Sequence, residues 1–448
     1  MRVSMRQVSA RLLCAASLAV TAGTAAAQPA ATPAAPPKAS PYAPATPAQP
    51  APLPEPAPAR MPGAEAYQRY TLAEALSIGH QRHPQLGALR ASMNAALLKQ
   101  RGIGEVKKSG GFLLPDIDQR TQQGDLGLQA AVAEYQQAEH EVTYAVVRCY
   151  YTVVYAREQN KVAKDLVEQL ETYLEQVRRI VNSKEGAVKG INKDTEQNLV
   201  NVLSMAKGRL IDAETGTERA RAALRESLGL EPGAKVDAAD ELLPEVSAEL
   251  KRDTVIAHAV SRRGEVALAA IGADVTRLEV LAQQANRLSI RVPTYANAGD
   301  IHARPIPPAQ REPDYKPGAI GPEMPDKIVG KVHTRTAIAA QYAERAEEAA
   351  RQARSLVGLE AEVGYTRYVE AAAKVKNYKF AAAQSKEMIE RQREAAGGNL
   401  TKEGILTIEV SAAQTYANYN QALYDQLVAL ANLERITAGG VRVNFPGR

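Results

Sequence analysis

Apolar positions between residues 126 and 181 follow each other at steps of four and three, which is the spacing of a coiled-coil seam. The stripe consists of Val142, Val146, Cys149, Val153, Ala156, Asn160, Ala163, Val167, Leu170, Leu174, Val177 and Val181. Asn160 is its one polar member, and a single polar residue in such a seam more often fixes register than performs chemistry. No proline falls between Pro115 and Pro232. The pattern predicts one uninterrupted helix, on the order of 85 Å long at a rise of about 1.5 Å per residue.

A second stripe predicts that this helix turns back on itself. Gly186 and Gly190 indicate a turn after Asn182, and a return helix follows over residues 193–228. Leucine alternates with small residues along the return helix, which lets two antiparallel helices approach closely. That stripe consists of Leu199, Leu203, Ala206, Leu210, Ala213, Thr217, Ala220 and Leu224.

Two helices are expected before the long one. Thr71-Leu-Ala-Glu74 has the form of a capping box and opens a short helix over residues 71–82. A second helix is expected from Pro84 to about Arg101, where a series of glycines begins, and residues 102–124 are expected to be irregular.

The second half of the chain repeats this order. Short and medium helices are predicted over residues 253–262 and 263–287, an irregular segment over 288–332, a long helix over 334–396, a Gly397-Gly398 turn and a return helix over 402–437. In each half the medium and return helices together match the long helix in length, so each half can form a two-stranded rod of uniform height. The predicted fold is therefore mainly α, built of two long antiparallel coiled-coil hairpins.

The beginning of the chain has a different composition. Residues 1–27 carry a basic start, a short apolar run and Ala25-Ala-Ala27, which are the parts of a secretory signal peptide. Residues 28–69 are rich in proline and alanine and are expected to form an extended tether. The predicted division is then a first helical repeat at 70–244, a second at 245–440 and a tail at 441–448.

Charge and chemistry-bearing residues exclude several classes of function. The net charge is +5, and three of these charges belong to arginines of the signal peptide, so nucleic acid is not expected as a partner. Outside that peptide Cys149 is the one cysteine, and it lies in the seam, so packing is expected rather than reactivity. The histidines lack metal-ligand spacing: His80, His83, His140, His258, His302 and His333. We therefore expect no catalytic residues, no cofactor and no metal, and the chain is not expected to be an enzyme.

Four lysines are unusually dense on the second long helix: Lys374, Lys376, Lys379 and Lys386. They are interpreted as a solvated surface face, with a channel lumen or a partner as the alternative.

The order of elements resembles the TolC family of outer-membrane efflux proteins over residues 70–440. The resemblance is carried by Thr71-Leu-Ala-Glu-Ala-Leu, the His83-Pro-Gln-Leu that follows, Leu114-Pro115 and the glycine turns before leucine-rich return helices. It implies a homotrimer whose helices form a hollow periplasmic cylinder, docked to a periplasmic adaptor protein and an inner-membrane transporter. The cylinder tip that meets the adaptor would then consist of Gly186, Ala187, Val188, Gly398, Asn399 and Leu400, although these glycines also serve tight helix reversal.

One region departs from the family pattern. The family places two membrane-spanning strands in each half, each of roughly 9–11 residues. Residues 104–124 are too short and too polar for such strands, and the prolines of residues 288–332 leave only Leu288–Val292 and Ile328–Val332 as short strand candidates. We expect a reduced, unusual or absent barrel.

Two functional hypotheses follow, and a third is disfavoured. The first is the outer-membrane channel of a tripartite efflux or secretion system, located in the outer membrane with a large periplasmic portion. The alternative is a periplasmic coiled-coil conduit or scaffold without membrane-spanning strands. An enzyme is disfavoured because no constellation of site residues emerges.

Overall fold

A computed structural model of the chain describes residues 67–110, 114–182, 193–295, 324–395 and 402–448. These residues belong to one unit that begins at Ala64, and residues 1–66 lie outside the described part. The predicted signal peptide and most of the predicted tether therefore stay predictions.

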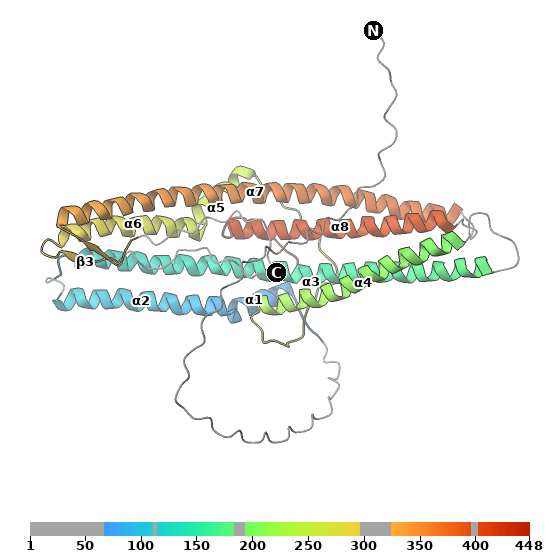
Figure 1. Ribbon diagram of the computed structural model, residues 1–448, viewed down its shortest axis with the longest axis horizontal. Coiled ribbons are helices and arrows are strands. Elements are labelled where there is room, and N and C mark those ends of the chain that lie inside the picture. The colour runs from blue at the N-terminus through green and yellow to red at the C-terminus, as the bar shows by residue number, and fades with distance from the viewer. Residues whose placement is uncertain (1–66, 111–113, 183–192, 296–323, 396–401) are drawn as a thin grey trace, which may run out of the picture. The chain divides into compact units, whose positions relative to one another are not determined.

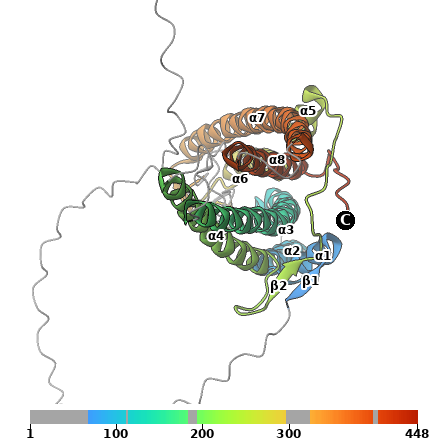
Figure 2. The same ribbon diagram turned by 90° about the vertical axis from the view of Figure 1, so that its right-hand side faces the viewer.

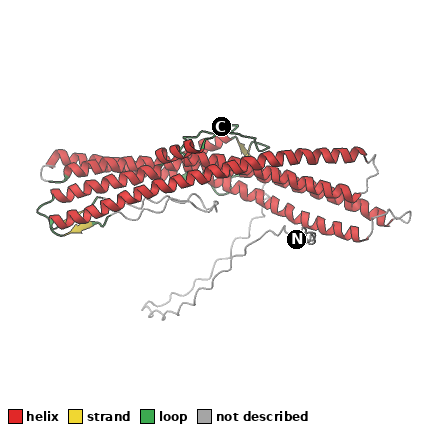
Figure 3. Ribbon diagram, turned by 90° about the horizontal axis from the view of Figure 1, so that it is seen from above, coloured by secondary structure: helices red, strands yellow, loops and turns green. Residues whose placement is uncertain are grey.

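The described unit is mainly α-helical, as the hydrophobic pattern predicts (Figure 3). Its helices are α1 (Leu72–Arg82), α2 (Pro84–Gly110), α3 (Ile117–Asn182), α4 (Lys193–Ser227), α5 (Arg252–Arg262), α6 (Gly264–Ala285), α7 (Val332–Ala395) and α8 (Lys402–Ile436). Its short strands are β1 (Gln68–Tyr70), β2 (Val236–Ala238), β3 (Arg291–Pro293) and β4 (Lys327–Val329).

The long helices lie side by side in four layers (Figure 1). Helix α3 packs against α2 and α4 on one side and against α6 and α8 on the other, and α7 packs against α6 and α8. Helix α3 has 66 residues, and α2 and α4, with 27 and 35, pack along it end to end. Helix α7 has 64 residues, and α6 and α8, with 22 and 35, pack along it in the same way. The predicted matching of lengths is thus present in both halves.

Burial follows the predicted seams. A core cluster joins α3 and α4 through Val167, Leu170, Leu174, Val177, Leu199, Leu203 and Ala206. The larger core draws on both halves of the chain, from Leu72 in α1 to Phe445 near the C-terminus. Helix α1 opens with the predicted capping box: the Thr71 side chain accepts from the Glu74 backbone N–H, and the Glu74 carboxylate accepts from the Thr71 backbone N–H.

Two helix boundaries predicted from glycines are wrong. Helix α2 continues through Gly102 and Gly104 to Gly110, and α3 begins at Ile117 rather than near residue 126. Packing between α2 and α3 outweighs the helix propensity of glycine, which is lower than that of alanine by about 1 kcal/mol per residue. Gln100 donates to Asp125 over 2.7 Å, and Lys107 pairs with Asp118 over 2.8 Å.

The two strand candidates of the second half pair with each other. Strands β3 and β4 run antiparallel, with Val292 opposite Ile328. Strands β1 and β2 pair in parallel and connect the start of the unit to the segment after α4. Among the described helices, none is both long enough and apolar enough to cross a membrane.

Because Leu170 is fully buried between α3 and α4, Leu170→Ala should lower the free energy of unfolding by about 2–5 kcal/mol. Urea denaturation followed by far-ultraviolet circular dichroism measures this loss. Leu98→Ala is the matched control, because Leu98 is 65% exposed on α2 and its truncation should change the midpoint little. Equal losses for the two variants would contradict the assignment of the seam.

Candidate functional site

The two turns predicted to form a docking tip lie outside the described residues. Gly186, Ala187, Val188, Gly398, Asn399 and Leu400 fall in the ranges 183–192 and 396–401. The helix ends that flank both turns lie at the same end of the unit, which we call the tip (Figure 1). The role of these six residues in docking stays a prediction.

One face of the helical layers carries the connecting segments. Figure 2, which looks along the helices, places α1, β1, β2 and the C-terminus on this side. The linker between β2 and α5 is fixed to it by side chains of three long helices: the Tyr150 hydroxyl on α3 accepts from the Asp240 backbone N–H, Tyr368 on α7 donates to the carbonyl of Ala248 over 2.5 Å, and Tyr419 on α8 donates to Glu245 over 2.6 Å. We call this side the linker face.

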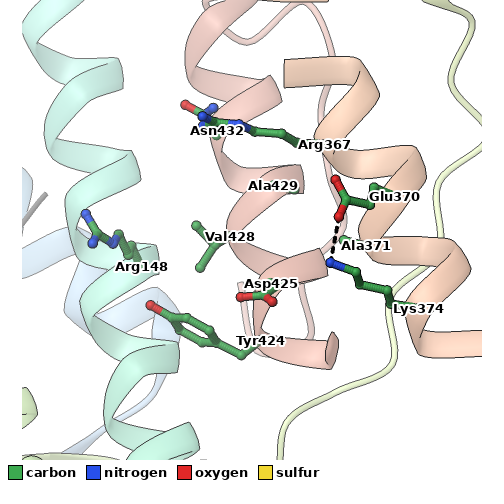
Figure 4. Close-up of a pocket in the computed structure, with 10 residues that line it drawn as sticks. All are labelled: Arg148, Arg367, Glu370, Ala371, Lys374, Tyr424, Asp425, Val428, Ala429 and Asn432. Atoms are coloured by element: carbon green, nitrogen blue, oxygen red, sulfur yellow. Dashed lines mark hydrogen bonds and ion pairs between the residues drawn. The ribbon is translucent and has the colours of Figure 1, made fainter. Parts of the chain in front are cut away.

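A polar cavity of about 310 Å³ lies between α3, α7 and α8 (Figure 4). Arg148 on α3 lies two residues before Tyr150, and two residues turn a helix by about 200°, so the cavity faces away from the linker. Arg148 and Tyr424 line it from α3 and α8, and Arg367, Glu370 and Lys374 line it from α7. Residues more than two hundred positions apart are brought together here, which the sequence did not indicate.

Charges in this cavity are partly matched. Lys374 pairs with Glu370 over 2.6 Å, which lowers the pKa of that carboxyl and raises the pKa of the ammonium group. Burial raises the pKa of Asp425, although the Gln421 amide donates to its carboxylate. Burial acts to lower the pKa of Arg148, but the neighbouring Tyr144 and Tyr424 outweigh it and raise this pKa. The polar cavity is therefore lined by both positively and negatively charged side chains.

A network of buried and half-buried charges joins four segments at the middle of the unit. Arg435, in the last turn of α8, donates to Glu141 on α3 over 2.9 Å and to Glu360 on α7 over 2.6 Å. Arg263, between α5 and α6, donates to Glu265 over 2.6 Å and also pairs with Glu360. Burial acts to lower the pKa of Arg435, and the two carboxylates outweigh it and raise this pKa. These five residues fix how the helices of the two halves are aligned along their axes.

A second polar network supports β3 and β4. Arg120 near the start of α3 pairs with the fully buried Glu279 on α6 and donates to the carbonyl of Pro293 in β3 over 3.0 Å. The fully buried Arg335 on α7 donates to Gln283 over 3.0 Å and to the carbonyl of Gly330 over 2.7 Å. Arg120 thus holds the backbone of β3 in position, and Arg335 holds the backbone just after β4.

Two histidines that lie far apart in sequence meet near the C-terminus. His80 on α1 is hydrogen-bonded to Thr143 on α3 over 2.8 Å. The positive charge of Arg448 disfavours protonation of both His80 and His140, and His80 also disfavours protonation of His140. Arg448 pairs with Glu434 through two contacts of 2.6 and 2.7 Å. Burial is the main cause that lowers the pKa of both histidines. His302 lies outside the described residues, and within the described ranges no cluster of side chains is arranged to hold a metal ion.

All four lysines of α7, Lys376 included, have exposed side chains, as expected of a solvated face, and three of them also line a cavity or pair with the linker. Lys374 lines the polar cavity, Lys379 pairs with Glu245 of the linker over 2.7 Å, and Lys386 lies on the tip side of that linker. Cys149 is a free thiol packed against the core, and burial raises its pKa to about 11, in agreement with a packing role.

Comparison with known proteins identifies the fold. No family model matches the chain, and no curated protein matches it. The structure of the outer-membrane channel OprN matches with a TM-score of 0.63 and 14% identity, over 84% of this chain and 94% of OprN. The outer-membrane protein VceC of Vibrio cholerae matches with a TM-score of 0.61 and 12% identity, over 82% of this chain and 96% of VceC. The fold is that of the TolC family.

Other structures with the TolC fold agree. The CmeC outer-membrane channel of Campylobacter jejuni matches with a TM-score of 0.57 and 11% identity, over 84% of this chain and 87% of CmeC. OprN and CmeC are described as outer-membrane channels. The resemblance seen in the order of sequence motifs thus extends to the three-dimensional arrangement of nearly the whole described unit.

Breaking the central network of this TolC fold should destabilise it. Arg435→Met leaves the carboxylate of Glu141 buried without its cation, so the free energy of unfolding should fall by about 3–5 kcal/mol. Arg277→Met is the control, because Arg277 pairs with Glu347 at the surface and its loss should have little effect. Urea denaturation compares the two variants, and a similar small effect for both would show that the network contributes little.

The free energy of unfolding should also depend on the protonation of His80 and His140. Their pKa values lie below 6.5 in the folded state, so the unfolded chain binds more protons. Their contribution is complete above about pH 6.5 and is lost as the pH falls below that value. The urea midpoint should therefore drop from about pH 7.5 to about pH 5.5. The double variant His80→Gln with His140→Gln should show a smaller drop, and an unchanged drop would assign the effect to other groups.

Proposed function

We propose that the chain is the outer-membrane channel component of a tripartite efflux or secretion system. Three copies would form a helical conduit through the periplasm, and substrates would pass through it after transfer from a periplasmic adaptor protein and an inner-membrane transporter. The channel itself performs no reaction. The observation that carries this proposal is the fold, which matches OprN over 84% of this chain and 94% of that channel.

The layer order supports a closed assembly. Helix α3 and the α6–α8 layer each have long helices on both sides, whereas α7 and the α2–α4 layer lie at the two edges (Figure 2). A second copy can therefore continue the wall by placing its α2–α4 layer against α7. Since the two edges differ, this contact is heterologous, and such contacts close into a ring when the rotation per copy allows it.

Apolar side chains at both edges support this contact. Phe380 on α7 is 68% exposed, and Met205 and Ile211 on α4 are 67% and 60% exposed. Side chains of this size are commonly buried in a folded protein or at an interface with a partner. Phe380 and Met205 lie in the halves of their helices nearer the tip, and Ile211 lies at the middle of α4, so the proposed contact would run along the periplasmic conduit.

The tip residues keep the role that the resemblance implies. The segments that contain Gly186 and Gly398 follow α3 and α7 in the sequence, and we propose that they form turns that meet the adaptor. The alternative function, a periplasmic conduit or scaffold that is not inserted in the membrane, is favoured by the shortness of β3 and β4, which have three residues each.

Fractionation of cells that express the full chain distinguishes the two. A channel should remain in the outer membrane after a carbonate wash and should migrate as a trimer after detergent extraction. Release as a soluble protein would overturn the channel and leave the conduit or scaffold. Retention as a monomer would overturn the trimeric cylinder.

Edge variants test the assembly in the same preparation. Phe380→Asp places a charge in the proposed contact, so it should reduce the trimer and, in a strain that depends on this chain, raise the accumulation of an exported dye. Leu281→Asp is the matched control, because Leu281 is 47% exposed but lies on α6, in an inner layer rather than at an edge. Equal behaviour of the two variants would contradict the proposed edge contact.

A further inference from the structure

A second cavity, larger and more apolar than the first, lies between α3, α7 and α8 on the tip side of the linker. It encloses about 580 Å³, and Leu242 of the linker lines it together with the three helices. Helix α8 contributes Ala412 and Ala413, whose small side chains leave the space open, and α3 and α7 form the flanking walls. We call this cavity the trough.

The walls of the trough are mostly apolar. Val162 and Leu166 project from α3, and Ile389 projects from α7. Positions 158–169 of α3 line it, and at about 1.5 Å per residue this corresponds to a length of roughly 16 Å. A cavity of this volume accommodates a small organic molecule with an extended apolar part.

One buried carboxylate lies at the linker end of the trough. Glu158 is 7% exposed, and its Oε1 accepts from the backbone N–H of Leu243 over 2.9 Å. Its Oε2 is buried and has no hydrogen-bond partner within the described part of the chain. A buried carboxylate oxygen without a donor raises the free energy of the folded state, and buried polar atoms in proteins are almost always hydrogen-bonded. Rotation of the carboxylate toward the trough, where a ligand could donate a hydrogen bond to it, would remove this penalty.

The surroundings select a cation as that donor. Lys161, Lys386 and Asp165 also line the trough but are exposed. Burial raises the pKa of Glu158 and outweighs the charges of Arg157 and Lys161, which act to lower it, and neither of these two forms an ion pair with it among the described contacts. The side chain of Gln159 on α3 donates to the backbone carbonyl of Ala417 on α8. The residues that precede these two, Glu158 and Tyr416, therefore lie at a similar height along the helices, and both line the trough. The face of a tyrosine ring attracts an ammonium group, and the carboxylate pairs with it. An anion would be repelled by Glu158, and a purely apolar molecule would leave Oε2 without a donor.

We propose that the trough binds a small amphiphilic ammonium compound, whose N–H groups donate to Glu158 and whose apolar body lies along Val162, Leu166 and Ile389. The site is complete within one copy of the chain. It therefore stands independently of the proposed export function and of the proposed trimer. Bound in this way, the ligand would contact the linker, α3, α7 and α8 together.

Dansylcadaverine is a suitable probe, because it joins a primary ammonium group to an apolar fluorophore through a five-carbon chain. The full-length protein should bind it with a blue shift of the dansyl emission. Its neutral analogue, N-pentyl dansylamide, should bind more weakly. Glu158→Gln should weaken binding of dansylcadaverine by about tenfold to hundredfold, the range for one charge-assisted hydrogen bond, and should leave the neutral analogue unchanged.

Two further variants separate the charge from the space. Ala413→Leu fills the trough and should abolish binding of both probes. Glu168→Gln removes an exposed carboxylate of α3 that does not line the trough, and it should bind both probes as the unaltered chain does. Thermal unfolding confirms that each variant is folded. Equal affinity of the Glu158→Gln and Glu168→Gln proteins for dansylcadaverine, or binding that survives Ala413→Leu, would overturn the proposal.

The pH dependence gives an independent readout. Burial raises the pKa of Glu158, so the carboxylate is ionised to a lesser extent at about pH 5 than at about pH 8. The probe amine is protonated at both values. Binding of dansylcadaverine should therefore strengthen with rising pH in the unaltered chain and not in Glu158→Gln. The same dependence in both proteins would assign it to a group other than Glu158 and overturn the proposed contact.

Discussion

The pairing of Arg435 and Arg263 with three glutamates, largely removed from water, is the constraint on which the rest of the arrangement depends. A charged group removed from water is tolerated only when opposite charges and hydrogen bonds surround it. Glu141, Glu265 and Glu360 supply these from α3, α6 and α7, so four segments must arrive at one level for any of them to be accommodated. The hydrophobic seams alone would allow the helices to slide by a heptad, whereas the charges allow one position.

The other polar networks act at different levels along the same helices. Near β3 and β4, Arg120 and Arg335 hold backbone carbonyls and the buried Glu279. Between the central network and the tip, Tyr155 and Gln159 of α3 bond to α8. Gly264 permits a close approach between the halves, since a Cβ atom there would lie 2.9 Å from the carbonyl oxygen of Ala133 on α3. Apolar seams thus supply most of the burial, and polar contacts set the alignment.

The periodic part of this structure was predictable from sequence and the aperiodic part was not. The seam from Val142 to Val181, the capping box at Thr71 and the starts of α4 and α8 follow from rules that act within one or two helical turns. The prediction that glycines end α2 is wrong at Gly102 and Gly104, because contacts between α2 and α3 outweigh the low helix propensity of glycine. The role of Asn160 in fixing the register of the seam stays a prediction, and polar contacts between α3 and α8 come from Tyr155 and Gln159.

The candidate sites escape sequence reasoning for a related reason. Each of them gathers side chains from helices that are distant in sequence: the polar cavity brings Arg148 beside Tyr424, and the trough brings Glu158 beside Tyr416. No short motif encodes such a pair, because the spacing that matters is measured across the layers rather than along the chain. In a fold made of long helices, charged residues at regular spacing are normally solvated, so a carboxylate such as Glu158 cannot be told from its neighbours until the linker is seen to cover it. The linker is fixed in turn by tyrosines on three helices, so the fold creates this buried acid only when both halves and their connection are in place.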